Sequence, residues 1–137
     1  MNRPVDIYKA AGILIQHRKF LIVRSKGKKF FMSPGGKIES GETARESLVR
    51  ELWEELHINV KEDDLTEFGT FYALAAGHEN SLLRMEVFMV EKWEGEITPA
   101  SEIEEILWVD SHLPDIELSS IFLHDVLPKL KQLDLIG

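Results

Sequence analysis

Three glutamates lie close together in the segment ELWEEL, as Glu51, Glu54 and Glu55. Carboxylate oxygens are preferred ligands of Mg²⁺, which commonly shares its coordination shell among carboxylates, waters and substrate phosphates. The spacing therefore indicates a divalent metal site. A metal held there would neutralise the charge of a pyrophosphate group and lower the pKa of a bound water, while a nearby glutamate accepted a proton.

A helix from Thr43 to Leu56 is expected to present these carboxylates. Thr43 and Glu46 have the spacing of a capping box, which marks the start of a helix. At about 100° per residue, the apolar side chains share one arc of this helix and the three glutamates share the next. The apolar arc consists of Leu48, Val49, Leu52, Trp53 and Leu56. One side of the helix can thus pack against a sheet while the other faces a ligand.

An ordinary solvated helix face is the alternative explanation for the three glutamates. Like charges at these spacings repel by roughly a few tenths of a kcal/mol per exposed pair, so clustering them adds nothing to the stability of a helix. Arg50 lies four residues from both Glu46 and Glu54. It can therefore hold acidic side chains in position through charge-assisted hydrogen bonds.

The helix needs a sheet to pack against, and apolar, β-branched segments on both sides of it predict strands. The expected strands are Ile7 to Gln16, Lys19 to Arg24, Leu65 to Ala73, Leu82 to Trp93 and Ile106 to Asp110. The first two are expected to form a hairpin around His17-Arg18, and SPGGK at 33–37 a loop. A final helix is expected from Ser120 to Leu133, kinked or divided by Pro128. This order predicts an α/β (α+β) fold with a mixed sheet between helices.

The composition of the 137 residues excludes several classes of site. No cysteine is present, so disulfides, zinc thiolate sites and thiol nucleophiles are excluded. The formal net charge of −8 argues against binding to a nucleic acid polymer or an anionic membrane surface. No apolar run is long enough to cross a bilayer, and the first ten residues lack the features of a secretory signal. A single cytoplasmic domain over 1–137 is therefore expected.

The segment GKIESGETARESLVRELWEELHI resembles the Nudix box, whose pattern is Gly, five residues, Glu, seven residues, then Arg-Glu-apolar-any-Glu-Glu-any-Gly-apolar. The matching residues are Gly36, Glu42, Arg50, Glu51, Leu52, Glu54, Glu55 and Ile58. The one departure is His57, which replaces the last glycine. Glycine suits a left-handed residue at a helix C-terminus, and histidine reaches positive φ more readily than most residues, so we expect only a changed cap.

The resemblance extends over most of the chain, because the family has a strand pair before the box and a Trp-Val strand after it, as in Trp108-Val109 here. It implies a Nudix-type α/β/α sandwich and a pyrophosphohydrolase that uses Mg²⁺, with Mn²⁺ as a substitute. The metal ligands that it implies are Glu51, Glu54, Glu55, a backbone carbonyl of Gly36 or Gly35, and an acidic residue before the Trp-Val strand.

Glu102 is our preferred candidate for that last ligand, over Glu104 and Glu105. The resemblance implies catalytic roles for Glu54, Glu51, Arg50 and Glu102, and it leaves open which glutamate is the general base. It also implies that the residue matching Glu42 supports the junction between loop and helix.

Lysines and aromatic residues near the loop are candidates to contact the rest of a substrate. Lys28, Lys29 and Lys37 can reach phosphates from their positions before and within SPGGK, although surface lysines are commonly only solvated. Phe30, Phe31 and Tyr72 either stack on a base or pack in the core.

The size of the chain favours a nucleoside triphosphate as substrate, including oxidised or noncanonical nucleotides, with a nucleoside monophosphate and pyrophosphate as products. Nucleotide sugars, ADP-ribose and dinucleoside polyphosphates are the alternatives. Many ADP-ribose hydrolases carry a proline that would fall at 74–76, where this chain has none. A non-catalytic nucleotide-binding module is a further alternative, but it would be expected to have lost carboxylates of the box. A homodimer is the default assembly.

Overall fold

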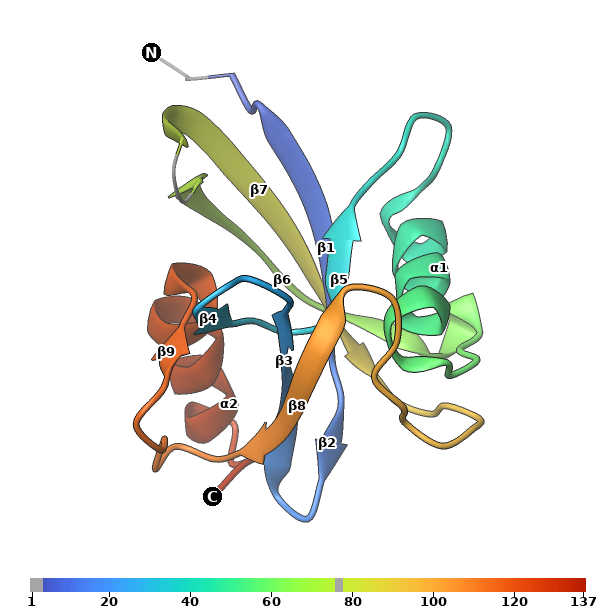
Figure 1. Ribbon diagram of the computed structural model, residues 1–137, viewed down its shortest axis with the longest axis vertical. Coiled ribbons are helices and arrows are strands. Elements are labelled where there is room, and N and C mark those ends of the chain that lie inside the picture. The colour runs from blue at the N-terminus through green and yellow to red at the C-terminus, as the bar shows by residue number, and fades with distance from the viewer. Residues whose placement is uncertain (1–3, 76–77) are drawn as a thin grey trace.

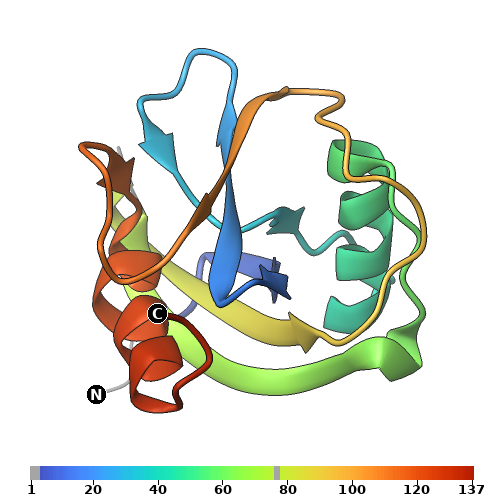
Figure 2. The ribbon, with the colours of Figure 1, turned by 90° about the horizontal axis from the view of Figure 1, so that it is seen from below.

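The computed structural model describes residues 4–75 and 78–137, so position 76 of the segment 74–76 lies outside the described residues. Within these residues the strands form three sheets, and the two helices α1 and α2 lie on opposite sides of the strands (Figures 1 and 2). This arrangement confirms the predicted α/β/α fold with a mixed sheet. No helix in the described ranges is long and apolar enough to span a membrane.

The largest sheet is mixed and has the order β5-β1-β7-β6. Strand β1 (Ile7–Ile13) pairs in parallel with β7 (His78–Val90), which pairs antiparallel with β6 (Leu65–Ala75). At the other edge, β5 (Gly35–Lys37) runs antiparallel to β1. The expectation of a loop is therefore wrong for these three residues. Ladder pairing uses only backbone groups, so glycines of low strand propensity can join a sheet when a neighbouring strand is in reach.

Two smaller sheets complete the strands. The first is antiparallel and consists of β2 (Ile15–Gln16), β3 (Lys19–Ser25) and β8 (Ile103–Val109). His17 and Arg18 form the turn between β2 and β3 at φ values of 51° and 61°, which confirms the predicted hairpin. The second joins β4 (Phe30–Phe31) to β9 (Glu117–Leu118) in parallel. Two-residue strands are too short to show a hydrophobic periodicity, so this pair could not be predicted from the sequence.

Helix α1 (Ala44–Leu56) is capped as predicted. The Thr43 side chain accepts a hydrogen bond from the Glu46 N–H at 3.1 Å, and the Glu46 carboxylate accepts one from the Thr43 N–H at 2.9 Å. In the predicted apolar arc Trp53 is 50% exposed, contrary to the prediction, whereas Leu48, Leu52 and Leu56 are at 0% exposure. They pack in one core cluster with residues of the sheets. The opposite arc of α1 is thereby held in a fixed orientation.

The last helix begins at Ser120, as predicted, and passes through a π-helical turn, Phe122–Val126, into α2 (Leu127–Gln132). The Leu127 N–H donates to the Phe122 carbonyl, one residue further back than in an α-helix. Pro128 has no N–H to donate, so a break in the regular α-helical bonding is expected at this point. The structure has this wider turn before Pro128, and the helix is not divided there. Phe122, Val126 and Leu130 fill the second core cluster.

Candidate metal centre and adjoining cavity

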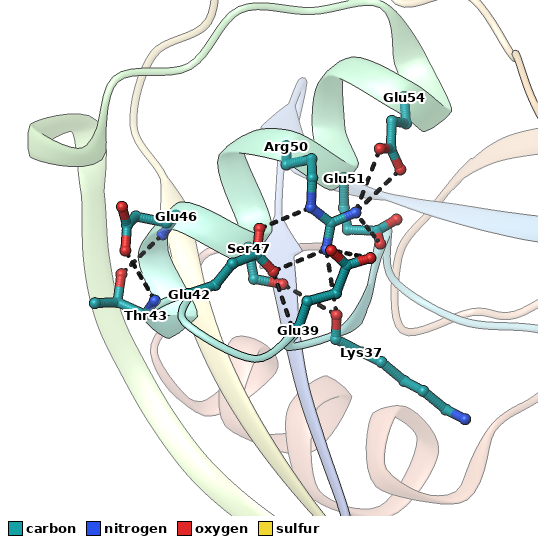
Figure 3. A network of polar contacts seen from close by, with 9 residues as sticks. All are labelled: Lys37, Glu39, Glu42, Thr43, Glu46, Ser47, Arg50, Glu51 and Glu54. Atoms are coloured by element: carbon teal, nitrogen blue, oxygen red, sulfur yellow. Dashed lines mark hydrogen bonds and ion pairs between the residues drawn. The ribbon is translucent and has the colours of Figure 1, made fainter.

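Arg50 lies at the centre of a network of carboxylates on α1 and on the loop before it (Figure 3). Its guanidinium donates to Glu42 at 2.7 and 2.9 Å, to Glu51 at 2.9 Å and to Glu54 at 3.2 and 3.3 Å. The hydrogen bonds from Arg50 are the main cause that lowers the pKa of Glu42 to about 2. Glu42 also accepts the Glu39 N–H at 3.0 Å, so it joins the loop to the helix.

Glu51 and Glu55 form a group with Glu102, in which one carboxylate oxygen from each residue lies within 4.8 Å of the others. The first two lie one helical turn apart on α1, and Glu102 comes from the loop immediately before β8. Glu54 lies outside this group, with a side chain that is 47% exposed and paired with Arg50. The structure thus brings three of the four predicted metal-binding glutamates together and leaves Glu54 at the edge of the cluster.

The loop that carries Glu102 is attached to the end of α1. The N–H groups of Thr98 and Ala100 donate to the carbonyls of Leu56 and Glu55, both at 2.9 Å. These carbonyls belong to the last turn of the helix, where no further helical N–H is available to them. The Glu102 carbonyl accepts the Lys26 N–H at 2.7 Å, which ties the loop to the end of β3. By contrast, Glu104 and Glu105 pair with Arg24 at 3.2 and 3.1 Å.

Two glycines allow β5 to pack closely, Gly36 against the Glu51 carboxylate and Gly35 against the backbone of β1. A Cβ on Gly36 would lie 2.7 Å from Glu51 Oε1, and one on Gly35, whose φ is +147°, would lie 2.0 Å from the Ala10 carbonyl oxygen. The Gly35 N–H donates to Glu55 Oε1 at 2.8 Å. The backbone that was predicted to supply a carbonyl ligand therefore lies directly against the carboxylate group.

Burial and hydrogen bonding give the three carboxylates different pKa values. Glu55 is 4% exposed, and burial is the main cause that raises its pKa to about 8. Burial also raises the pKa of Glu51, in spite of the neighbouring Arg50. The pKa of Glu102 is lowered, chiefly because the Ser101 hydroxyl donates to it at 2.6 Å. A group of hard oxygen donors that repel one another when ionised is suited to a divalent cation.

A cavity of about 440 Å³ adjoins this group, a size suited to a small ligand. Its lining includes Glu55 and Glu102 together with Lys28 and Lys37. The Lys37 side chain extends away from the Arg50 network (Figure 3). Lys29 contributes instead to a separate surface depression. The structure therefore brings two of the three candidate lysines to the carboxylates.

The three candidate aromatic residues lie in different environments. Phe30 lines the cavity, whereas Phe31 is 4% exposed and belongs to the core. Tyr72 is 54% exposed and does not contribute to the cavity among the residues described. Phe30 is thus the only one of these three candidates that lines the cavity beside the carboxylate group.

Lys9, Ser119 and Ser120 also line the cavity, and sequence reasoning did not identify them. The signal in the sequence that could have identified Lys9 is that it interrupts an apolar strand. Ser119 and Ser120 lie at the start of the last helix, just after β9, and only the tertiary structure brings this position to the cavity.

Comparisons with known proteins are consistent with this geometry. The NUDIX domain model matches residues 6–128. An uncharacterised Nudix hydrolase of Bacillus subtilis is 32% identical over 92 residues, which are 67% of this chain and 58% of that protein. The 8-oxo-dGTP diphosphatase of Escherichia coli is 40% identical over 92 residues, 64% of this chain and 67% of that protein. A MutT NUDIX hydrolase from Burkholderia pseudomallei, 17% identical over 94% of this chain and 95% of its own, has the same fold with a TM-score of 0.72.

Proposed function

The chain belongs to the NUDIX family of pyrophosphohydrolases, as its box predicted, and we propose that it hydrolyses nucleoside triphosphates to a nucleoside monophosphate and pyrophosphate. Oxidised and noncanonical nucleotides are included among the proposed substrates. The 8-oxo-dGTP diphosphatase activity named for the Escherichia coli relative supports this substrate class.

The observation that carries the proposal is one cavity with opposite charges on its walls. Glu55 and Glu102 lie in the lining with Lys28 and Lys37, and Glu51 completes the carboxylate group. Carboxylates alone would repel an anionic substrate, and lysines alone would bind any anion. Together they suit a phosphate chain that binds along with a divalent cation.

The residues present fit Mg²⁺, with Mn²⁺ as a substitute. Glu51, Glu55 and Glu102 would hold the cation, with a carbonyl of Gly35 or Gly36, and Glu54 would supply a further carboxylate at the edge of the group. When bound, the cation would neutralise phosphate charge and lower the pKa of a coordinated water.

The other side chains position and assist these glutamates. Arg50 holds Glu51 and Glu54 in position through hydrogen bonds. Lys37 and Lys28 would bind phosphate oxygens on the cavity side. Proton acceptance from the attacking water falls to one of the glutamates of this site, and variants are needed to identify it.

The test is turnover with Mg²⁺ of a panel that contains nucleoside triphosphates, 8-oxo-dGTP, nucleotide sugars, ADP-ribose and dinucleoside polyphosphates. Release of nucleoside monophosphate and pyrophosphate from the triphosphates is expected. Glu54→Gln and Glu55→Gln should each lower kcat by at least about 100-fold, as loss of general base or metal chemistry does. Glu67→Gln changes an exposed carboxylate on β6 and serves as the control. Absence of turnover across the panel with Mg²⁺ and Mn²⁺, or full activity of both site variants, would refute the proposal.

A further inference from the structure

Lys9 lies in the middle of β1, on the side of the sheet that faces the cavity. Side chains alternate along a strand, so Lys9 shares its face with Ala11 and Ile13, which belong to the core cluster beneath α2. Lys9 itself is partly buried and contributes to the cavity lining. Lys9 therefore contributes a partly buried cationic side chain to the cavity wall.

This ammonium group has no partner in the described part of the chain. It takes part in no salt bridge and no side-chain hydrogen bond there, whereas buried charges are normally paired. Burial is the main cause that lowers its pKa, with a contribution from Lys37, and the opposite charges of Glu55 and Glu51 offset part of this effect. Lysines are rarely placed in such an environment for stability, because desolvation of the charge is unfavourable.

The pairing register of β1 and β5 increases the cost of placing the Lys9 charge in this environment. Lys9 lies directly opposite Lys37 in the antiparallel pair of β1 and β5. Like charges at opposed positions destabilise a sheet. Lys28 lines the same cavity, so three lysines share it. An anion between them would remove the repulsion and satisfy the unpaired ammonium group.

We propose that Lys9 binds a phosphate group of the substrate and favours substrates with longer, unesterified phosphate chains. This inference rests on the proposed hydrolase function and extends it to a choice among substrates. Polar side chains suited to reading a base are few in the described lining, where Ser25, Ser119 and Ser120 are the only uncharged ones. Selection by phosphate charge is therefore favoured over selection by hydrogen bonds to the base edge.

The test compares Lys9→Met, which removes the charge at similar length, with Lys9→Arg, which keeps a charge. Lys19→Met is the control, because Lys19 is exposed and does not line the cavity. Binding of inorganic tripolyphosphate in the presence of Mg²⁺ is measured by calorimetry. Loss of one charge-assisted hydrogen bond should weaken binding about 10- to 100-fold in Lys9→Met. Lys9→Arg and Lys19→Met should remain within roughly threefold of the wild type.

Two further readouts separate substrate binding from a structural role. Thermal unfolding should show that Lys9→Met is at least as stable as the wild type, because an unpaired, partly buried charge has been removed. In turnover, Lys9→Met should raise KM for nucleoside triphosphates with little change in kcat, and raise it less for nucleotide sugars. If Lys9→Met does not fold, Lys9→Gln replaces it in every measurement.

Equal affinity of wild type and Lys9→Met for tripolyphosphate would overturn the inference, as would an equal loss in Lys19→Met. Equal increases in KM for triphosphates and nucleotide sugars would overturn the preference for longer chains. Binding of tripolyphosphate can be measured without turnover. If the wild type hydrolyses no nucleotide but binds tripolyphosphate, and Lys9→Met loses this binding, the proposed function is refuted and Lys9 is supported as a phosphate-binding residue.

Discussion

At the level of single residues, Glu55 combines deep burial with membership of a carboxylate group. It is 4% exposed and accepts one hydrogen bond from the Gly35 N–H. Burial raises its pKa to about 8, so the metal-free protein holds a proton on this side chain at neutral pH. A cation that binds to Glu55 must displace that proton.

This raised pKa predicts how the stability of the metal-free protein depends on pH. The ordinary pKa of the carboxyl is 4.5 and its folded value is about 8, so between these values the folded state binds more protons than the unfolded state. The free energy of unfolding should therefore fall as pH rises from about 5 to 8, by up to a few kcal/mol. Urea denaturation in EDTA measures this. Glu55→Gln should have a flatter profile over that range, and an unchanged slope in this variant would contradict the assignment.

Replacement by alanine should have a different effect at each of the two glycines of β5. In Gly36→Ala the new methyl meets the end of the Glu51 side chain, which can move, so we expect metal affinity to fall about tenfold or more while most stability is retained. In Gly35→Ala the methyl meets the Ala10 carbonyl at 2.0 Å, and neither backbone can move freely. Gly35→Ala should therefore destabilise the fold by about 2 kcal/mol or more. Mn²⁺ titration and urea denaturation separate the two, and identical behaviour of both variants would contradict this account.

At the level of secondary structure elements, α1 ends in a histidine where the family pattern has glycine. His57 has a φ of 54° and a ψ of 37°, in the left-handed region, and its N–H donates to the Trp53 carbonyl at 3.0 Å. Its ring stacks on Trp53 with 5.2 Å between the ring centroids. Stacking of this kind offsets part of the cost of the left-handed conformation. The expectation of a changed cap is therefore confirmed, and the stack is its physical basis.

Substitution of His57 should change stability without changing catalysis. His57→Ala retains the left-handed strain and loses the stack, so we expect a loss of about 1 kcal/mol. His57→Gly loses the stack but relieves the strain, and should lie within about 1 kcal/mol of the wild type. Urea denaturation gives these values, and kcat should stay within about twofold because residue 57 supplies no carboxylate. In a Trp53→Leu background the cost of His57→Ala should shrink, and an undiminished cost would exclude the stack as its cause.

The elements that could be predicted are those whose signal is local. The capping box of Thr43 and Glu46 and the apolar arc of α1 are contained in the helix itself, so its bounds followed from the sequence. The strand β5 depends on pairing with a distant segment of the chain, and the approach of Glu102 to Glu55 could be expected only from the family resemblance. Lys9 gave a local signal as a charge within an apolar strand, but the cavity that it lines is formed by segments that only the tertiary structure brings together.

At the level of the whole molecule, the candidate metal centre joins parts of the chain that are separate in sequence. Glu51 and Glu55 come from α1, Glu102 from the loop before β8, and Gly35 from β5. The unfolded chain has no such group of ligands, so a cation that binds the folded state should stabilise it as a whole. The formal net charge of −8 makes the metal-free state less favourable still, because these carboxylates add to the repulsion.

Mg²⁺ or Mn²⁺ should therefore raise the melting temperature of the protein. At a metal concentration of about 100 times Kd, the added stability is about 2.7 kcal/mol, which corresponds to roughly 5 to 10 °C. The increase should be smaller at pH 6 than at pH 8, because the proton on Glu55 competes with the metal. Glu51→Gln and Glu102→Gln should each reduce it, whereas Glu67→Gln should not. NaCl at the same ionic strength measures screening alone, and an equal rise in NaCl would show that charge screening, not a bound cation, stabilises the fold.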